Sequence, residues 1–279
     1  MRQGPFRTIP QGQYSEVILG FFDILGFSNL TRSKCLESPN YLIGIFNQVD
    51  GYSKLHTEVE VRIVSDSIVL WSSNHQLGLA TIVNVASLLQ TVLLREGILI
   101  RGVIAKGKHF ATKINETELV GTTIKESINP SDEVIVSPVL VHCVELEKKL
   151  TEPIIVLDES VKQVLTSANE KMPWVSDYLE DYNGKIIING YFTSHEFLAI
   201  QHKIRVSETG PNSPENQAKM HHEVATKLIG SIRTYILNGL DNSDERIRVK
   251  WAFVGKRFNE MLDSAAQFFP ELSTSKIEI

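Results

Sequence analysis

The stretch EVILGFFDILGFS, residues 16–28, decides how this sequence is interpreted. Its first seven residues form an apolar run whose length suits a buried β-strand. Asp23 follows this run directly, and Gly26 permits a tight turn three residues later. The stretch therefore predicts a core strand that ends at Asp23 and delivers a carboxylate to a turn.

A second aspartate lies in the stretch VEVRIVSDSIVLWSS, residues 59–73. Apolar and polar residues alternate before and after Ser65 and Asp66, which predicts a β-hairpin with Asp66 at or near its turn. Turns on neighbouring strands lie side by side, and two carboxylates placed so repel each other unless a cation lies between them. Taken singly, each aspartate is more often a turn former or helix cap.

Hydrophobic periodicity and turn residues predict the remaining elements. A strand is expected at 98–105, closed by a tip at 106–108, and residues 107–135 are expected to be rich in loops. Further strands are expected at 153–157, 185–189 and 197–201, and helices at 39–55, 77–95, 138–150 and 159–168.

Composition restricts the class of protein. The 279 residues include 42% hydrophobic and 22% charged residues, as in ordinary globular proteins. The net charge of -5 argues against a general polynucleotide binder, which needs a basic surface. Residues 77–94 are apolar but interrupted by polar side chains, so a buried helix is favoured over a membrane span. Without a signal peptide or a CxxC pair, a cytoplasmic protein with reduced cysteines is expected.

The C-terminal third differs in composition from the rest. Residues 206–217 are polar and rich in Pro, Gly and Asn, so they are interpreted as a linker between a domain at 1–205 and an extension at 218–279. Helices are expected at 215–238 and 243–264, forming a hairpin that packs on the sheet domain or on a partner subunit.

Particular residues support this hairpin. Gly239 is placed to end its first helix, and Asn242 with Glu245 resembles a capping pair for the second. The apolar face of the second helix is expected to consist of Trp251, Val254, Phe258 and Met261.

Several motifs, taken in order, resemble the class III nucleotidyl cyclases. The stretch FDILGFS at 22–28 resembles the first metal motif of that family, and RIVSD at 62–66 resembles the second, with Ser65 where glycine is usual. Residues 99–107 and 137–157 are similar to a later strand and to a helix–strand unit, and residues 248–251 with Asn259 are similar to a C-terminal helix of some bacterial cyclases. The resemblance implies an α+β, ferredoxin-like catalytic domain with an antiparallel sheet, to which the helical hairpin is added.

The resemblance also implies roles for particular residues. Asp23, Asp66 and the carbonyl of Ile24 would hold two divalent cations, Mn²⁺ or Mg²⁺, which suit oxygen ligands. The catalytic residues by this resemblance would be Asp23 and Asp66. Arg101 is added to them as a candidate for phosphate contact, because it is a cation inside an apolar strand. Substrate contacts would come from Phe22, Leu25, Gly26, Phe27, Ser28, Arg62 and Lys106, with backbone N–H groups around the turn binding phosphates.

Two departures from the family pattern affect the expected activity. Purine-specific members carry a lysine where this chain has Arg62, whose planar guanidinium can bind two acceptors on one base edge. An exposed charge facing Glu60 is the alternative. The family's transition-state Asn and Arg correspond here to Val141 and Glu145, which cannot perform that role. Arg101 lies in an apolar strand, so its side chain needs a partner.

These departures resemble those of the antiphage pyrimidine cyclases of the Pycsar type. That likeness implies conversion of UTP or CTP to cyclic UMP or cyclic CMP, a homodimer with composite active sites, and a separate effector that responds to the cyclic nucleotide. No membrane or polynucleotide partner is expected. An adenylate cyclase with an unusual base pocket is the alternative enzyme, and a degenerate nucleotide-binding module is the alternative outside enzymes.

Overall fold

The computed structural model describes residues 14–27, 43–44, 59–113, 133–189, 214–265 and 275–279. The predicted helix at 39–55, apart from two helical residues, and the predicted strand at 197–201 lie outside this part of the chain. Ser28 and Cys35 also lie outside it, whereas Cys143 is buried as a free thiol.

The described elements follow the chain in a mixed order of strands and helices. The strands are β1 (Ser15–Leu25), β2 (Glu60–Val64), β3 (Ser67–Ser73), β4 (Leu99–Lys113), β5 (Glu133–Val136), β6 (Ile155–Leu157), β7 (Leu179–Tyr182) and β8 (Lys185–Ile188). The helices are α3 (Gln76–Arg95), α4 (Pro138–Glu147), α5 (Lys162–Lys171), α7 (Pro214–Leu240) and α8 (Glu245–Ala265), with short 3₁₀ helices η2 (Glu159–Val161) and η3 (Pro173–Tyr178).

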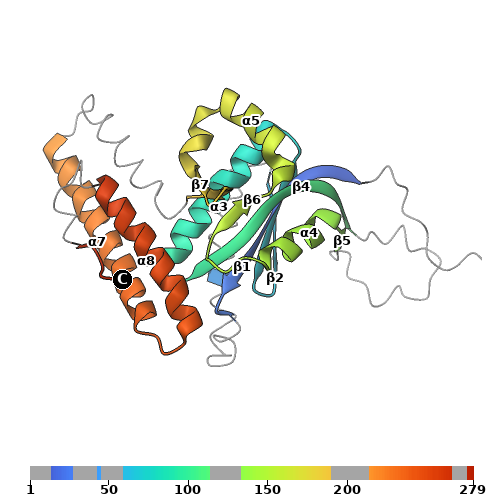
Figure 1. Ribbon diagram of the computed structural model, residues 1–279. Helices are drawn as coiled ribbons and strands as arrows, with labels where there is room; N and C mark the ends of the chain where they lie inside the picture. The colour runs from blue at the N-terminus through green and yellow to red at the C-terminus, as the bar shows by residue number, and fades with distance from the viewer. Residues whose placement is uncertain (1–13, 28–42, 45–58, 114–132, 190–213, 266–274) are drawn as a thin grey trace, which may run out of the picture.

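One sheet runs through the molecule in the order β2-β3-β1-β4-β6-β8-β7, with β5 paired to β4 (Figure 1). The four strands β2-β3-β1-β4 are antiparallel to their neighbours, and the β4–β6 pair is parallel. This arrangement confirms the predicted α+β class with an antiparallel, ferredoxin-like sheet at its centre.

Alternation along β1 divides the core between the two faces of the sheet, because successive strand side chains point to opposite sides. Ile18, Phe22 and Ile24 pack with the buried side chains of α3 and α5 on one face, called the α3 face below. Val17, Leu19 and Phe21 pack with α4 on the other, called the α4 face. Asp23 continues the second series, so its side chain belongs to the α4 face.

Helix α3 is long and apolar enough to cross a membrane, but 78% of its most apolar window is buried inside the protein. Its side chains form the centre of the α3-face core. The helix begins at His75, whose side chain accepts a hydrogen bond from the Gly78 N–H. The predicted buried helix at 77–95 is therefore confirmed.

Two sequence predictions about strand ends were wrong. Strand β1 continues past Asp23 to Leu25, and Gly26 follows with a φ of 84°. Strand β4 continues through the predicted tip at 106–108 to Lys113. Gly107 serves close packing there rather than a turn, because a Cβ at this position would lie 3.0 Å from the Cβ of Val139 in α4. The expected loop-rich segment therefore begins with strand.

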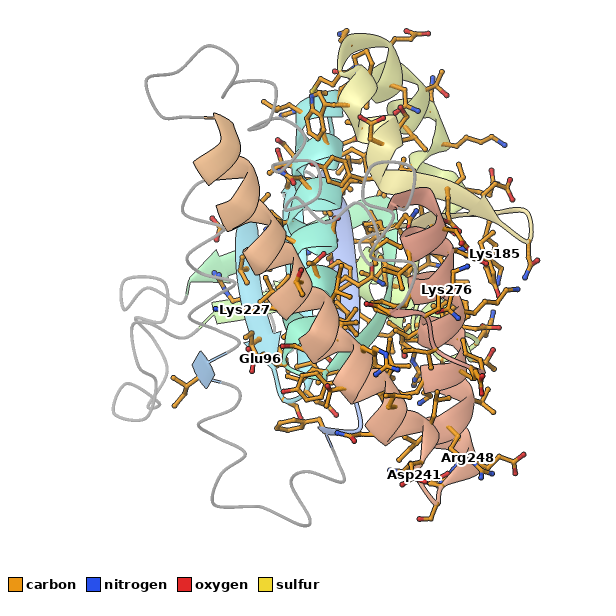
Figure 2. All side chains as sticks on the ribbon, turned by 90° about the vertical axis from the view of Figure 1, so that its left-hand side faces the viewer. Glu96, Lys185, Lys227, Asp241, Arg248 and Lys276 are labelled. Carbon is orange, nitrogen blue, oxygen red and sulfur yellow. The ribbon has the colours of Figure 1, made fainter. Side chains whose placement is uncertain are left out.

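The helical hairpin packs on the chain's own sheet domain. The predicted apolar residues Trp251, Val254, Phe258 and Met261 are all buried, together with residues of α7. They share a core with Leu94 of α3 and Leu99 of β4, and Leu25 of β1 packs against it. Figure 2 looks onto the two helices, with Asp241 and Arg248 near the turn between them. Helix α7 begins at Pro214, inside the predicted linker, because the helical pattern extends further than the Pro- and Asn-rich composition suggested.

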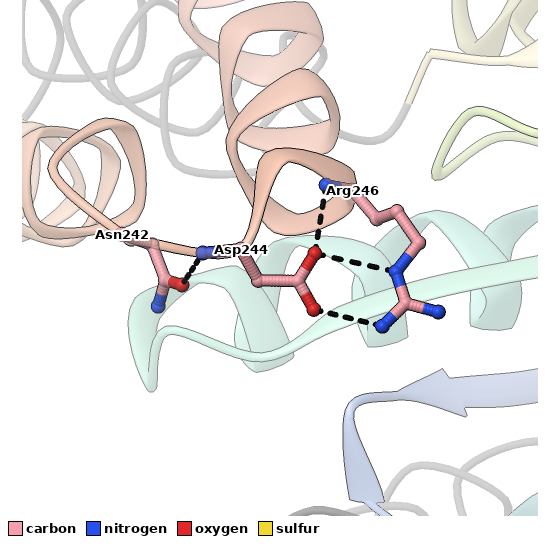
Figure 3. A network of polar contacts seen from close by, with 3 residues as sticks. All are labelled: Asn242, Asp244 and Arg246. Carbon is pink, nitrogen blue, oxygen red and sulfur yellow. Dashed lines mark hydrogen bonds and ion pairs between the residues drawn. The ribbon is translucent and has the colours of Figure 1, made fainter.

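The turn between α7 and α8 is capped differently from the prediction. Asn242 Oδ1 accepts the N–H of Asp244, and Asp244 in turn accepts the N–H and the guanidinium of Arg246 (Figure 3). Asp244, rather than Asn242 with Glu245, is the acceptor for the free N–H groups at the start of α8. Gly239 does not end α7, and it instead makes room for the Trp251 ring, which a Cβ would approach to 2.1 Å.

Candidate functional site

The two predicted metal ligands come from adjacent parts of the sheet. Asp23 of β1 lies opposite Ser67, the first residue of β3, and Asp66 lies in the turn that precedes β3. The Ile24 N–H donates a hydrogen bond of 2.9 Å to the Asp66 carbonyl, which fixes the turn against β1. Ser65 reaches the turn geometry with a φ of 58°, a conformation that explains why glycine would also suit this position.

The carbonyl of Ile24 belongs to the same centre. A strand residue directs its N–H and its C=O to the same neighbouring strand. Because the Ile24 N–H points to the Asp66 turn, its carbonyl oxygen does so as well. The Ile24 side chain, by contrast, is buried in the α3-face core.

Arg101 forms an ion pair with Asp23. The two residues face each other across β1 and β4, and Arg101 Nη2 lies 3.5 Å from an Asp23 carboxylate oxygen. Arg101 Nε donates to the buried carboxylate of Glu147, and Nη1 donates to the Leu150 carbonyl over 2.9 Å. The sequence indicated that Arg101 needs a partner, and these contacts at the end of α4 supply it.

The surroundings of Asp23 disfavour its negatively charged form, despite the ion pair with Arg101. The pKa of Asp23 is raised to about 6, because burial, the Glu147 carboxylate and the Asp66 carboxylate together outweigh the opposing charges of Arg101 and Lys250. A carboxyl with such a pKa gains from a nearby cation. Glu147 is therefore a member of this centre that the sequence analysis missed. Its position at the end of a predicted helix, together with an arginine that needs a partner in an apolar strand, could have indicated the ion pair.

The donor set fits a divalent cation. Within the described residues, no group of three or more His, Cys, Asp or Glu side chains converges. Mg²⁺ and Mn²⁺ nevertheless take as few as one or two carboxylates when phosphate oxygens complete their shell. The paired carboxylates, the Ile24 carbonyl and the raised pKa of Asp23 match this requirement.

Arg62 lies on the same face of the sheet but is already engaged. Its guanidinium stacks 5.2 Å from the centre of the Trp71 ring, and Nη1 donates to the Val61 carbonyl over 2.7 Å. Arg62 Nη1 also lies 3.4 Å from Glu60, so the expected charge contact with Glu60 exists, but it lies within strand β2 and not across strands.

The structure places Lys106 outside this centre. Lys106 lies opposite Ile18, five residues along β1 from Asp23, or about 17 Å at strand spacing. Its ammonium is 3.5 Å from Glu16, and it alternates onto the opposite face from Arg101. A role for Lys106 in binding the same substrate is not supported.

The turn residues after Asp23 have mixed roles. Phe22 and Phe27 are buried in the α3-face core, and Leu25 packs against α7 and α8. Among the described residues, a Cβ at Gly26 would meet nothing within 4 Å, so none of them covers the backbone there. Val141 and Glu145, which correspond to the family's transition-state Asn and Arg, are exposed on α4.

Sequence reasoning also missed a cation from the C-terminal hairpin. Lys250 of α8 is half-buried, and it lowers the pKa of Asp23 through its charge. Burial, followed by the charge of Arg101, lowers the pKa of Lys250 itself. Asn259, by contrast, has a structural role, since its side chain exchanges two hydrogen bonds with the Ile277 backbone.

No protein-family model matches the chain, and no curated protein shows significant similarity to it. Solved structures with similar chain paths include adenylyl and guanylyl cyclase domains. The monomeric guanylyl cyclase domain of the RhoGC fusion protein from the aquatic fungus Blastocladiella emersonii is 14% identical, with a TM-score of 0.46 over 63% of this chain and 96% of that one. The adenylyl cyclase CyaB from P. aeruginosa is 14% identical, with a TM-score of 0.41 over 63% and 94%.

A third similar structure is the guanylate cyclase domain of RhGC from Catenaria anguillulae, crystallised in complex with GTP. It is 17% identical, with a TM-score of 0.42 over 55% of this chain and 82% of that one. Similarity at this level does not transfer a function between proteins, so the assignment depends on this chain's own residues.

Proposed function

We propose that this protein is a nucleotide cyclase that converts UTP or CTP into the 3′,5′-cyclic nucleotide and pyrophosphate. The observation that carries the proposal is the pairing of Asp23 with Asp66, held by the Ile24–Asp66 hydrogen bond on an open turn. The ordered sequence motifs that resemble class III cyclases give the same assignment. In the reaction, the ribose 3′-oxygen bonds to the α-phosphorus while the bond to the β-phosphate breaks.

Each group at the centre has a separate task. Asp23, Asp66 and the Ile24 carbonyl would hold the divalent cations, which supply positive charge to the attacking and leaving oxygens when bound. The open backbone at Gly26 offers N–H groups to the phosphates. Glu147 and the Leu150 carbonyl orient the Arg101 guanidinium toward Asp23. Positioning and charge neutralisation of this kind account for most of phosphoryl transfer catalysis.

Pyrimidine specificity is supported by Arg62. Its guanidinium lies on the α4 face, and its planar donors can bind a carbonyl oxygen and ring nitrogen of a base once it leaves Glu60. Resemblance to the Pycsar enzymes supports a cytoplasmic homodimer whose product acts on a separate effector in antiphage defence. An adenylate cyclase is the alternative outcome for the same site.

The decisive experiment is incubation of the purified protein with Mn²⁺ and each of the four ribonucleoside triphosphates, with products identified by mass spectrometry. Cyclic UMP or cyclic CMP is the expected product. Preferential formation of cyclic AMP would replace the pyrimidine assignment. Absence of cyclic product from all four substrates would refute a cyclase.

One observation favours a second candidate, a nucleotide-binding module without turnover. The Nε and Nη1 donors of Arg101 are committed to Glu147 and Leu150, and Val141 and Glu145 cannot stabilise a transition state. Binding of UTP, measured by isothermal titration calorimetry, without any cyclic product would select this candidate.

A further inference from the structure

Helix α8 turns one side toward the α4 face of the sheet. Lys250, Phe253 and Arg257 recur at helical spacing on this side of the helix. Phe253 packs edge-on against Tyr182 of β7, with ring centres 5.6 Å apart, and Arg257 forms an ion pair with Glu180. These contacts fix the rotation of α8, so Lys250 also points toward the sheet.

The apolar side of the same helix fixes its position along the sheet. Trp251, Val254 and Phe258 share a core with Leu99, and Leu25 packs against that core. Leu25 lies two residues after Asp23, and Leu99 lies two residues before Arg101, on the same side of their strands. Helix α8 is thus anchored immediately beside the Asp23–Arg101 pair.

Lys250 is half-buried at this position. Among the residues that the structure describes, no hydrogen bond or ion pair engages its ammonium group. The charges of Arg101 and Arg246 both act on it unfavourably, and those of Asp23 and Asp244 act favourably. Burial and then the charge of Arg101 disfavour the charged form of Lys250, and an anion bound beside its ammonium group would offset these effects.

We propose that Lys250 binds a phosphate group of the nucleotide held at the Asp23–Asp66 centre, so that the C-terminal hairpin contributes a cation to the centre of its own chain. The proposal rests on the proposed function for the identity of the anion as a nucleoside triphosphate. A lysine is suited to this task, because its ammonium group is a mobile point charge on a flexible stem. The hairpin is then a part of the binding site as well as a packing element.

Binding of inorganic tripolyphosphate with Mn²⁺ tests the proposal independently of turnover, since this anion has no ribose to cyclise. Isothermal titration calorimetry would compare the wild type with Lys250→Met, Lys250→Gln and Lys250→Arg. Loss of one charged phosphate contact should weaken binding about tenfold in the Met and Gln variants. The Arg variant, which keeps the charge, should stay within about threefold of the wild type.

The matched control is Lys256→Met, which removes an exposed lysine from the same helix and should leave tripolyphosphate affinity unchanged. UMP offers one phosphate in place of three, so its affinity should fall by less than that of tripolyphosphate in Lys250→Met. A merely structural role for Lys250 would weaken both ligands equally. Circular dichroism checks that each variant is folded, and the Gln and Arg variants carry the test if Lys250→Met is not.

The outcomes separate this proposal from the proposed function. Equal tripolyphosphate affinity in Lys250→Met and Lys256→Met would overturn the role of Lys250, as would a wild type that binds no tripolyphosphate. Binding that depends on Lys250, in a protein that forms no cyclic product from any triphosphate, would support the phosphate contact and refute the cyclase.

Discussion

The two faces of the sheet are built from the same strands but have different chemistry. On the α3 face, Phe22 and Ile24 enter a core of apolar side chains. On the α4 face, Asp23, which lies between them in sequence, pairs with Arg101, and the charges of Glu147 and Lys250 shift its pKa. Strand β1 therefore supports stability with the side chains on its α3 face and chemistry with those on its α4 face.

The largest expected effect on stability comes from the α3 face. Phe22→Ala removes a fully buried aromatic ring and should lower the free energy of unfolding by about 4 kcal/mol, because a cavity remains. Urea denaturation followed by circular dichroism measures this loss. A loss below about 1 kcal/mol would mean that the α3 face is not packed as described.

Substitution of the paired carboxylates should affect activity instead. Asp23→Ala or Asp66→Ala should lower the rate of cyclic nucleotide formation at least about 100-fold, because the metal charge is no longer held at the reacting phosphate. Rates of cyclic product formation in saturating Mn²⁺ measure the change. Asp177→Ala, an exposed carboxylate on the α3 side, is the control and should stay near the wild-type rate. Comparable losses in all three variants would contradict the assignment.

Glu147 links stability and charge on the α4 face. Glu147→Gln leaves the Arg101 guanidinium with a weaker partner and should reduce stability by about 2 kcal/mol. It should also lower the pKa of Asp23, since the Glu147 carboxylate raises it. Glu145→Gln, on the exposed side of the same helix, should change stability by less than about 0.5 kcal/mol. Equal effects of the two substitutions in urea denaturation would show that the ion pair is unimportant.

The smallest effect is a dependence of stability on pH. The pKa of Asp23 is about 6 in the folded protein, against an ordinary value of 3.8. At a pH between these two values, the folded protein therefore binds more protons than the unfolded chain does. Metal-free protein should therefore lose about 1–2 kcal/mol of stability as pH rises from 4 to 6. Asp23→Asn should abolish this part of the slope, and an unchanged slope in the variant would assign it to other groups.

Much of the fold followed from the sequence. The alternation in 59–73 predicted the hairpin with Asp66 in its turn, and periodicity predicted α3, α4 and both C-terminal helices. Strand ends were less predictable. Gly107 is compatible with a turn in the sequence, and only the packing of Val139 shows that it lies within a long strand. Strand β7, which the sequence did not indicate, forms by pairing with β8.

By itself, the sequence determined which residues could carry the chemistry. Asp23 and Asp66 were identified because a carboxylate after an apolar strand and a carboxylate in a hairpin turn are local patterns. The tertiary structure alone decided the charges around them. Glu147, Arg101 and Lys250 come from α4, β4 and α8, and their effect on Asp23 depends on distance and burial, which local sequence does not encode.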